Sequence, residues 1–180
     1  MIELTSIASR VAEFRLHPLG FYYFQDTCED GTSERVHVWL PHGSDRPEND
    51  RHQHPYDIRS QVILGRLRSE LFNFTERAGG TEREFQVTYP TGGSILRGTG
   101  RVGELELLCA FQTSAGESYF LRAGVIHRAV ALVKPCVTTL TTRQRHIPVL
   151  TYGQEVEPPF ERRHIDANEA GQLSKILVSI

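Results

Sequence analysis

Short apolar segments rich in β-branched and aromatic residues make up most of the sequence between about residues 20 and 145. Gly and Pro residues separate these segments, and this kind of sequence favours strands joined by turns. Many short strands in succession are typical of a sandwich or barrel, and they argue against a parallel α/β sheet. We expect strands over residues 21–27, 35–40, 60–67, 69–74, 84–89, 104–112, 119–121, 128–133 and 137–142.

Apolar residues recur at helical spacing near both ends of the chain. Leu4, Ile7, Val11 and Phe14 predict an amphipathic helix over about residues 5–15.

The C-terminal pattern is stronger, because it includes a start signal. Asp166 and Glu169 have the spacing of a capping box, and an apolar stripe follows them. The pattern predicts a helix over about residues 166–177. The expected fold is therefore all-β: a single domain over residues 1–180, with a barrel core over about 20–145 and a short helix on each side.

The balance of charged residues argues against two classes of partner. Lys and Arg total 20 against 22 Asp and Glu, so the formal net charge is −2. Nucleic-acid binders and membrane-surface proteins need a basic surplus. No apolar run approaches the ~20 residues of a membrane-spanning helix. We therefore expect neither a nucleic acid nor a membrane as a partner.

The cysteines and the first residues indicate a compartment. The three cysteines are odd in number and form no C-x-x-C pair, which is typical of reduced thiols. The N-terminal residues include acidic side chains within their apolar pattern, unlike a targeting segment. We expect a cytoplasmic protein.

A His-x-His pattern is the first indication of a functional site. Residues i and i+2 of a strand face the same way, so His52 and His54 would both project into the barrel. Two imidazoles on one face are half of a transition-metal site, since neutral imidazole suits Fe, Ni, Cu and Zn. Alone, the pattern more often marks two polar residues at a loop edge.

The residues around this pattern resemble the first motif of the cupin superfamily, G-x5-H-x-H-x3,4-E-x6-G. The matching positions are His52, His54 and Gly65. Arg46 stands in place of the first glycine. Ile58 stands in place of the glutamate and cannot bind a metal.

A later stretch resembles the second cupin motif, G-x5-P-x-G-x2-H-x3-N. The matching positions are Gly116, Gly124 and His127. Arg122 replaces the proline and Ala131 replaces the asparagine. The two motifs occur in the family's order, and together they cover about residues 35–142. The resemblance implies a cupin-type β-barrel, an antiparallel double-sheet jelly roll, in agreement with the strand pattern.

The resemblance implies a facial metal site formed by His52, His54 and His127. Three neutral ligands leave a divalent ion its full charge and open positions for a substrate and O2. Within the superfamily, loss of the motif's glutamate is a feature of thiol dioxygenases. Fe(II) is therefore the first expectation, with Zn, Ni or Mn as alternatives. The implied activity is that of a mononuclear non-haem iron dioxygenase on a small anionic molecule bearing a thiol or a carboxylate.

Beyond the histidines, the similarity to thiol dioxygenases is weak. Those enzymes carry a Ser-x-His-x-Tyr relay after the third histidine, whereas residues 138–142 here read TTLTT. Threonine hydroxyls do not titrate near neutral pH and cannot replace that relay. The family also places a carboxylate-binding Arg or Gln on a strand before the His-x-His pattern. Gln25 is the counterpart in this chain.

Three charged residues near the motifs have more than one interpretation. Asp57 is a displaced metal ligand, a carboxylate that orients a ligating histidine, or a cap at the start of a strand. Arg122 and Arg128 flank the second motif, and each either orients an anionic substrate or forms an ion pair at the barrel rim. His17 is expected at the surface, and His37 at the surface or hydrogen-bonded within the sheet.

Other functions are compatible with the same barrel, because a fold does not determine an activity. One alternative is a metal- or ligand-binding cupin without turnover, for example a sensor. Another is a metal-dependent isomerase or lyase. In all of them the partner is a small molecule, and the superfamily's habit implies a homodimer.

Overall fold

The computed structural model describes residues 4–28, 30–41, 50–90, 93–154 and 158–180. The chain begins with the helix α1 (Leu4–Ala8) and the 3-10 turn η1 (Val11–Glu13), and it ends with the helix α2 (Ala167–Val178). The strands are β1 (Arg15–Leu16), β2 (Tyr22–Thr27), β3 (Thr32–Trp39), β4 (Arg51–Gln53), β5 (Tyr56–Glu76), β6 (Glu82–Thr88), β7 (Gly93–Ser114), β8 (Ser118–Leu121), β9 (Ile126–Gln144), β10 (Leu150–Gly153) and β11 (Phe160–Glu161).

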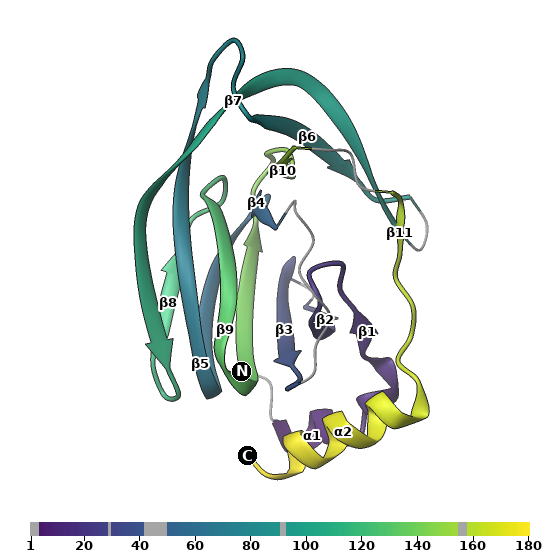
Figure 1. Ribbon diagram of the computed structural model, residues 1–180. Coiled ribbons are helices and arrows are strands. Elements are labelled where there is room, and N and C mark those ends of the chain that lie inside the picture. The colour runs from purple at the N-terminus through teal and green to yellow at the C-terminus, as the bar shows by residue number, and fades with distance from the viewer. Residues whose placement is uncertain (1–3, 29, 42–49, 91–92, 155–157) are drawn as a thin grey trace.

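The strands form one antiparallel sheet that folds back on itself (Figure 1). Its order is β1-β2-β3-β9-β4-β10-β6-β7-β5-β8, and β11 adds to β7. Because β9 pairs with β3, β4 and also β5, the path curls into a barrel rather than a flat layer. The expected all-β fold with a short helix at each end is confirmed.

Two strands are much longer than the sequence pattern indicates. The segments expected at 60–67 and 69–74 belong to the single strand β5, and those at 128–133 and 137–142 belong to β9. The register of β5 against β9 shifts around Gly65. Gly65 has φ of 80°, and an added Cβ would collide with the Val133 carbonyl. The glycine therefore marks a bulge that bends a continuous strand.

The N-terminal helix differs from the expectation of one helix over 5–15. Helix α1 ends at Ala8, and after the turn η1 the chain is already extended at Arg15. Burial of Ile7, Val11 and Phe14 is nevertheless complete or nearly so. Arg10 lies between α1 and η1, and its guanidinium pairs with the Asp26 carboxylate of β2 at 2.7 Å. The apolar spacing thus predicted the buried residues but not a continuous helix.

The C-terminal helix is confirmed in position and in its start signal. Helix α2 follows Asp166, whose side chain accepts the Glu169 N–H, while Glu169 accepts the Asp166 N–H. Arg163 donates to both Glu169 oxygens at 2.6 Å, and the Tyr22 hydroxyl donates to the same carboxylate at 2.7 Å. The helix is therefore tied to β2 as well as packed on it.

The barrel extends beyond the expected core of 20–145. Strand β1 lies before it, and β10 and β11 lie after it. Strand β10 sits inside the sheet, between β4 and β6. Strands of two to four residues carry too little periodicity to be identified from sequence, since their pairing depends on distant backbone partners.

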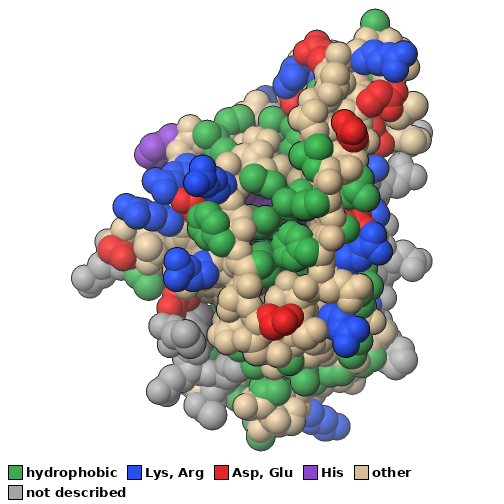
Figure 2. All heavy atoms as spheres, turned by 90° about the vertical axis from the view of Figure 1, so that its left-hand side faces the viewer, with side chains coloured by type: hydrophobic (Ala, Val, Ile, Leu, Met, Phe, Trp, Pro, Cys, Tyr) green, Lys and Arg blue, Asp and Glu red, His purple; other side chains and the backbone are tan. Residues whose placement is uncertain are grey.

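The main apolar cluster lies between the helices and one face of β2 and β3. Its buried members include Ile7, Val11, Phe14, Tyr22, Phe24, Val36, Val38, Leu40, Val137, Leu173 and Leu177. Figure 2 shows apolar side chains gathered on another face, and Leu107, Leu108 of β7 and Phe120 of β8 are exposed. Among the described residues, no helix is both long and apolar enough to cross a membrane.

Candidate metal centre and its cavity

Three histidines from two neighbouring segments meet inside the barrel. His52 lies in β4, His54 follows that strand, and His127 is the second residue of β9. His52 and His127 face each other as register partners. One ring nitrogen from each residue lies within 4.8 Å of the others. The structure thus brings together the three histidines singled out from the sequence.

Backbone carbonyls orient two of these rings. The Nδ1–H of His52 donates to the Asp50 carbonyl at 2.8 Å, and that of His127 donates to the Val125 carbonyl at 3.0 Å. With the proton on Nδ1, each Nε2 carries a lone pair. The Nε2 atoms of His52 and His54 are 3.1 Å apart. This is the arrangement in which backbone groups fix the tautomer of a ligating imidazole.

Burial keeps the three imidazoles uncharged. Burial, with a smaller contribution from the nearby His52, lowers the pKa of His127 to about 3. Burial is also the main reason why the pKa of His52 and that of His54 lie below their ordinary value. A neutral imidazole is the form that binds a metal. The donor set therefore fits a borderline transition metal such as Fe, Ni or Zn.

Asp57 is not a member of this cluster, and the hydrogen bonds of its carboxylate go to groups other than the histidines. One carboxylate oxygen accepts the Ala123 N–H at 3.0 Å, and the other accepts Arg145 Nη2 at 2.7 Å. The Ala123 N–H and then Arg145 lower the pKa of this carboxyl. Asp57 anchors the start of β5 to the turn that precedes His127, as in the third interpretation.

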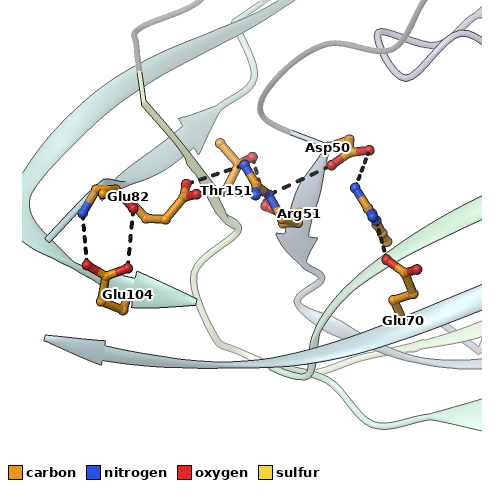
Figure 3. A network of polar contacts seen from close by, with 8 residues as sticks. Asp50, Arg51, Glu70, Glu82, Glu104 and Thr151 are labelled. Carbon is orange, nitrogen blue, oxygen red and sulfur yellow. Dashed lines mark hydrogen bonds and ion pairs between the residues drawn. The ribbon is translucent and has the colours of Figure 1, made fainter. Parts of the chain in front are cut away.

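An ion-pair network lies beside the cluster (Figure 3). The Asp50 carboxylate is 3.8 Å from Arg128 and 3.9 Å from Arg51, and Arg128 also pairs with the buried Glu70. Arg51 pairs in turn with Glu82 at 3.2 Å. Because Arg51 and Arg128 are the chain neighbours of His52 and His127, the network connects the segments that carry two of the three histidines.

A cavity of about 290 Å³ opens at the cluster. Its walls include His17 and His37. Both rings contact Phe21, with centroids 4.3 and 4.5 Å away. Burial lowers the pKa of His37 to about 3. The expected surface position of His17 is therefore corrected. His37 lies in the sheet, as one of its two interpretations had it, on the strand face that lines the cavity.

Positive charge exceeds negative charge among the described cavity residues. Arg35, Lys134 and Arg162 line the cavity, and Asp50 is the one carboxylate there. Gln25 also lines it, in agreement with its candidate role. Arg122 and Arg128 are not among the described lining residues. For Arg128 the structure shows the ion pair that was the alternative interpretation.

Arg35, Arg162 and the two extra histidines are the site residues that sequence reasoning missed. For His37 a signal was present: it alternates with Val36 and Val38, so these valines face the opposite side. This alternation does not show which side of the strand faces the interior of the barrel. Arg162 lies far along the chain, after β11, and no local pattern indicates its place at the cavity.

Comparison with known proteins identifies no family for this chain. The chain matches no protein-family model. It matches no curated protein. Solved structures similar to it include a variant of oxalate decarboxylase from Bacillus subtilis, with 11% identity, a TM-score of 0.42, and coverage of 74% of this chain and 28% of that chain. An oxalate oxidase in complex with glycolate has 15% identity, a TM-score of 0.43, and coverage of 74% and 55%.

A formate complex of Lactobacillus farciminis oxalate decarboxylase is similar at the same level, with 15% identity, a TM-score of 0.41, and coverage of 76% of this chain and 31% of that chain. The chain thus spans between 28% and 55% of the length of these three proteins. Scores in this range carry no argument about activity. The features that the cupin resemblance implies are present in the structure itself: an antiparallel barrel with three clustered histidines inside it.

Proposed function

We propose that the protein is a mononuclear non-haem Fe(II) dioxygenase acting on a small anionic molecule. The observation that carries the proposal is the cluster of His52, His54 and His127, with ring nitrogens within 4.8 Å beside a cavity. Fe(II) comes first because an all-imidazole set suits iron, whereas oxygen ligands suit manganese. Zn and Ni fit the same donors, and Mn is the weakest of the four candidates.

The three histidines would hold the ion. A ferrous ion there would supply Lewis acidity, electrons, and adjacent positions for a substrate atom and O2. The chain's own part is to keep the three imidazoles neutral and to fix two of them through the Asp50 and Val125 carbonyls. Phe21 and Trp39 give the cavity an apolar wall, which would limit water beside a bound substrate.

The charge of the cavity supports an anionic substrate. Three cationic side chains line the cavity against one carboxylate, and that carboxylate already interacts with Arg128 and Arg51. The uncompensated charge attracts anions and disfavours cations. We therefore expect the cavity to attract small anions toward the histidine cluster.

Two measurements on the untagged protein test this proposal. Elemental analysis, before and after loading with Fe(II), Zn, Ni or Mn, gives the metal preference. An oxygen electrode then measures O2 uptake with thiols, amino acids, diketones and carboxylates. We expect one iron per chain and substrate-dependent uptake, absent in His52→Ala and present in His146→Ala, whose side chain is exposed.

Other outcomes select a different function. One zinc per chain with no O2 uptake for any substrate would contradict the dioxygenase and favour a sensor, isomerase or lyase. Full metal content in His52→Ala would contradict the site itself.

A further inference from the structure

Two arginines in the cavity each have a buried donor without a partner. Arg35 comes from β3 and Arg162 follows β11, and both line the cavity. Within the described part of the chain, the Nε of each is buried and makes no hydrogen bond. Buried donors in proteins are nearly always satisfied, and a guanidinium keeps its charge and cannot become an acceptor. Because each Nε is enclosed by protein atoms, a ligand in the cavity would meet the terminal nitrogens of these two cationic groups, which can only donate hydrogen bonds.

Tyrosines hold both guanidinium groups in place. Arg35 Nη1 donates to the Tyr56 hydroxyl at 2.6 Å, and its guanidinium lies 4.6 Å from the centre of that ring. Arg162 lies 5.0 Å from the Tyr89 ring and 5.8 Å from the Tyr23 ring. Such contacts fix the guanidinium planes without using their Nε donors. The two groups are thus pre-organised at a tyrosine-lined part of the cavity.

This part of the cavity is connected to the histidine cluster through one ring. Tyr56, which contacts Arg35, also stacks on His54 with centroids 4.7 Å apart and planes at 12°. A ligand group bound at Arg35 therefore lies one side-chain ring away from a cluster histidine. The remaining walls are largely aromatic, with Phe21, Trp39 and Tyr119 among the lining residues.

We propose that Arg35 and Arg162 form a carboxylate subsite, and that the ligand is a small aromatic carboxylate whose ring lies between this subsite and the histidines. A carboxylate matches the planar donors of a guanidinium. The aromatic walls suit a flat ring, and about 290 Å³ has room for one substituted ring. The inference rests on the proposed function, because it names the substrate class of the same cavity.

The chain contains a built-in reporter for this test. Trp39 is its one tryptophan, and it lines the cavity. Its fluorescence is titrated with benzoate, with the neutral analogue benzamide, and with the non-aromatic cyclohexanecarboxylate. Calorimetry checks each affinity independently. Every titration is done on the protein as purified and again after removal of metal by a chelator.

Substitutions assign the charge to particular residues. Arg35→Met and Arg162→Met keep the length of the side chain but remove its charge and donors. Arg122→Met is the matched control, since Arg122 is exposed and is not among the described lining residues. We expect the Kd of benzoate to rise at least about tenfold in each cavity variant, as for loss of a charge-assisted hydrogen bond. Arg122→Met should leave this Kd unchanged.

The ligand pairs keep the proposal testable even if a variant does not fold. On the unmodified chain, we expect benzamide and cyclohexanecarboxylate to bind at least about tenfold more weakly than benzoate. Equal binding of benzamide, or no binding of benzoate, would overturn the carboxylate subsite. Equal binding of cyclohexanecarboxylate would overturn the aromatic ligand.

The metal-free titrations separate this proposal from the proposed function. Benzoate binding that depends on Arg35 in metal-free protein supports the subsite, even where no O2 uptake is found. Benzoate binding that disappears with the metal and is insensitive to both arginines would overturn it, while leaving the metal centre intact.

Discussion

The two faces of the β2–β3 hairpin belong to two different regions of the molecule. On β3, Val36 and Val38 enter the apolar cluster under the helices, whereas Arg35, His37 and Trp39 line the cavity. On β2 the same alternation occurs: Tyr22 and Phe24 are in the cluster, and Tyr23 and Gln25 are at the cavity. One pair of strands thus separates a filled region from an open one.

The difference shows how stability and chemistry are divided. Under the helices, the apolar side chains are nearly inaccessible and fill the space, which is the arrangement that stabilises a fold. In the cavity, imidazole and guanidinium groups line the walls, and polar groups away from bulk water cost free energy unless they are hydrogen-bonded. Changes on the two faces should therefore affect different properties.

The largest effect is expected from His127→Ala on metal binding. A three-histidine site that loses one ligand keeps two anchors and loses its facial geometry, so stable metal binding should be abolished. The thermal midpoint of the metal-free variant should change little, since the barrel's stability comes from the other face. Metal content per chain and a thermal melt check both expectations. Retention of full metal would show that His127 is not a ligand.

Leu173→Ala should have the opposite pattern. Leu173 of α2 is fully buried in the apolar cluster. Truncation of such a side chain lowers the free energy of unfolding by about 2–5 kcal/mol. Urea unfolding measures this loss, and metal content per folded chain should stay at the level of the unmodified protein. A parallel loss of metal would mean that the two faces are coupled, and the division would fail.

Asp50→Asn should have a smaller effect, confined to the cavity face. The substitution keeps the carbonyl that accepts the His52 Nδ1–H but removes the charge that faces Arg128 and Arg51. Because the carbonyl partner of His52 is kept and only a neighbouring charge is lost, metal affinity should fall by less than the roughly 10–100-fold expected for loss of a direct partner of a ligating histidine. Competition with a metal-binding dye measures the affinity. An unchanged affinity would reduce the network of Figure 3 to a purely structural role.

The smallest expected effect is a pH dependence of the free energy of unfolding, caused by Glu169 on the helix-covered face. The Arg163 guanidinium, followed by the Asp166 N–H and Tyr22, lowers the pKa of Glu169 from 4.5 to about 2, against the opposing effect of its burial. Because this pKa is lower in the folded state, the stabilisation of the fold by ionised Glu169 is complete above pH 4.5. It is lost as the pH falls toward 2. We expect roughly 1–2 kcal/mol, reduced by solvent screening of the half-exposed Arg163.

Urea unfolding between these pH values measures the contribution, with Glu169→Gln as the comparison. The variant should be less stable at neutral pH, and its stability should fall less on acidification. Identical slopes for the two proteins would show that Glu169 does not carry this pH dependence.

The sequence predicted what depends on local pattern. It indicated an all-β fold, the capping box of α2, and the three histidines that converge. It did not indicate the bulge at Gly65, because a bulge depends on the register with the partner strand β9, and the pattern instead divided the segment at Arg68. It missed Arg35 as a cavity residue, since alternation shows which residues share a face but not what that face encloses. Strand β10 and Arg162 depend on pairing between distant segments, which no local window contains.

Strand β10 has a consequence for how the protein is made. Thr151 of β10 is the register partner of His52, and His127 is its partner on the other side. Synthesis proceeds from the N-terminus, so a nascent chain carries His52 and His54 through most of its elongation without either neighbouring strand. The three histidines can therefore come together only after the start of β9 has been made, and the His52 segment gains its second neighbouring strand later still.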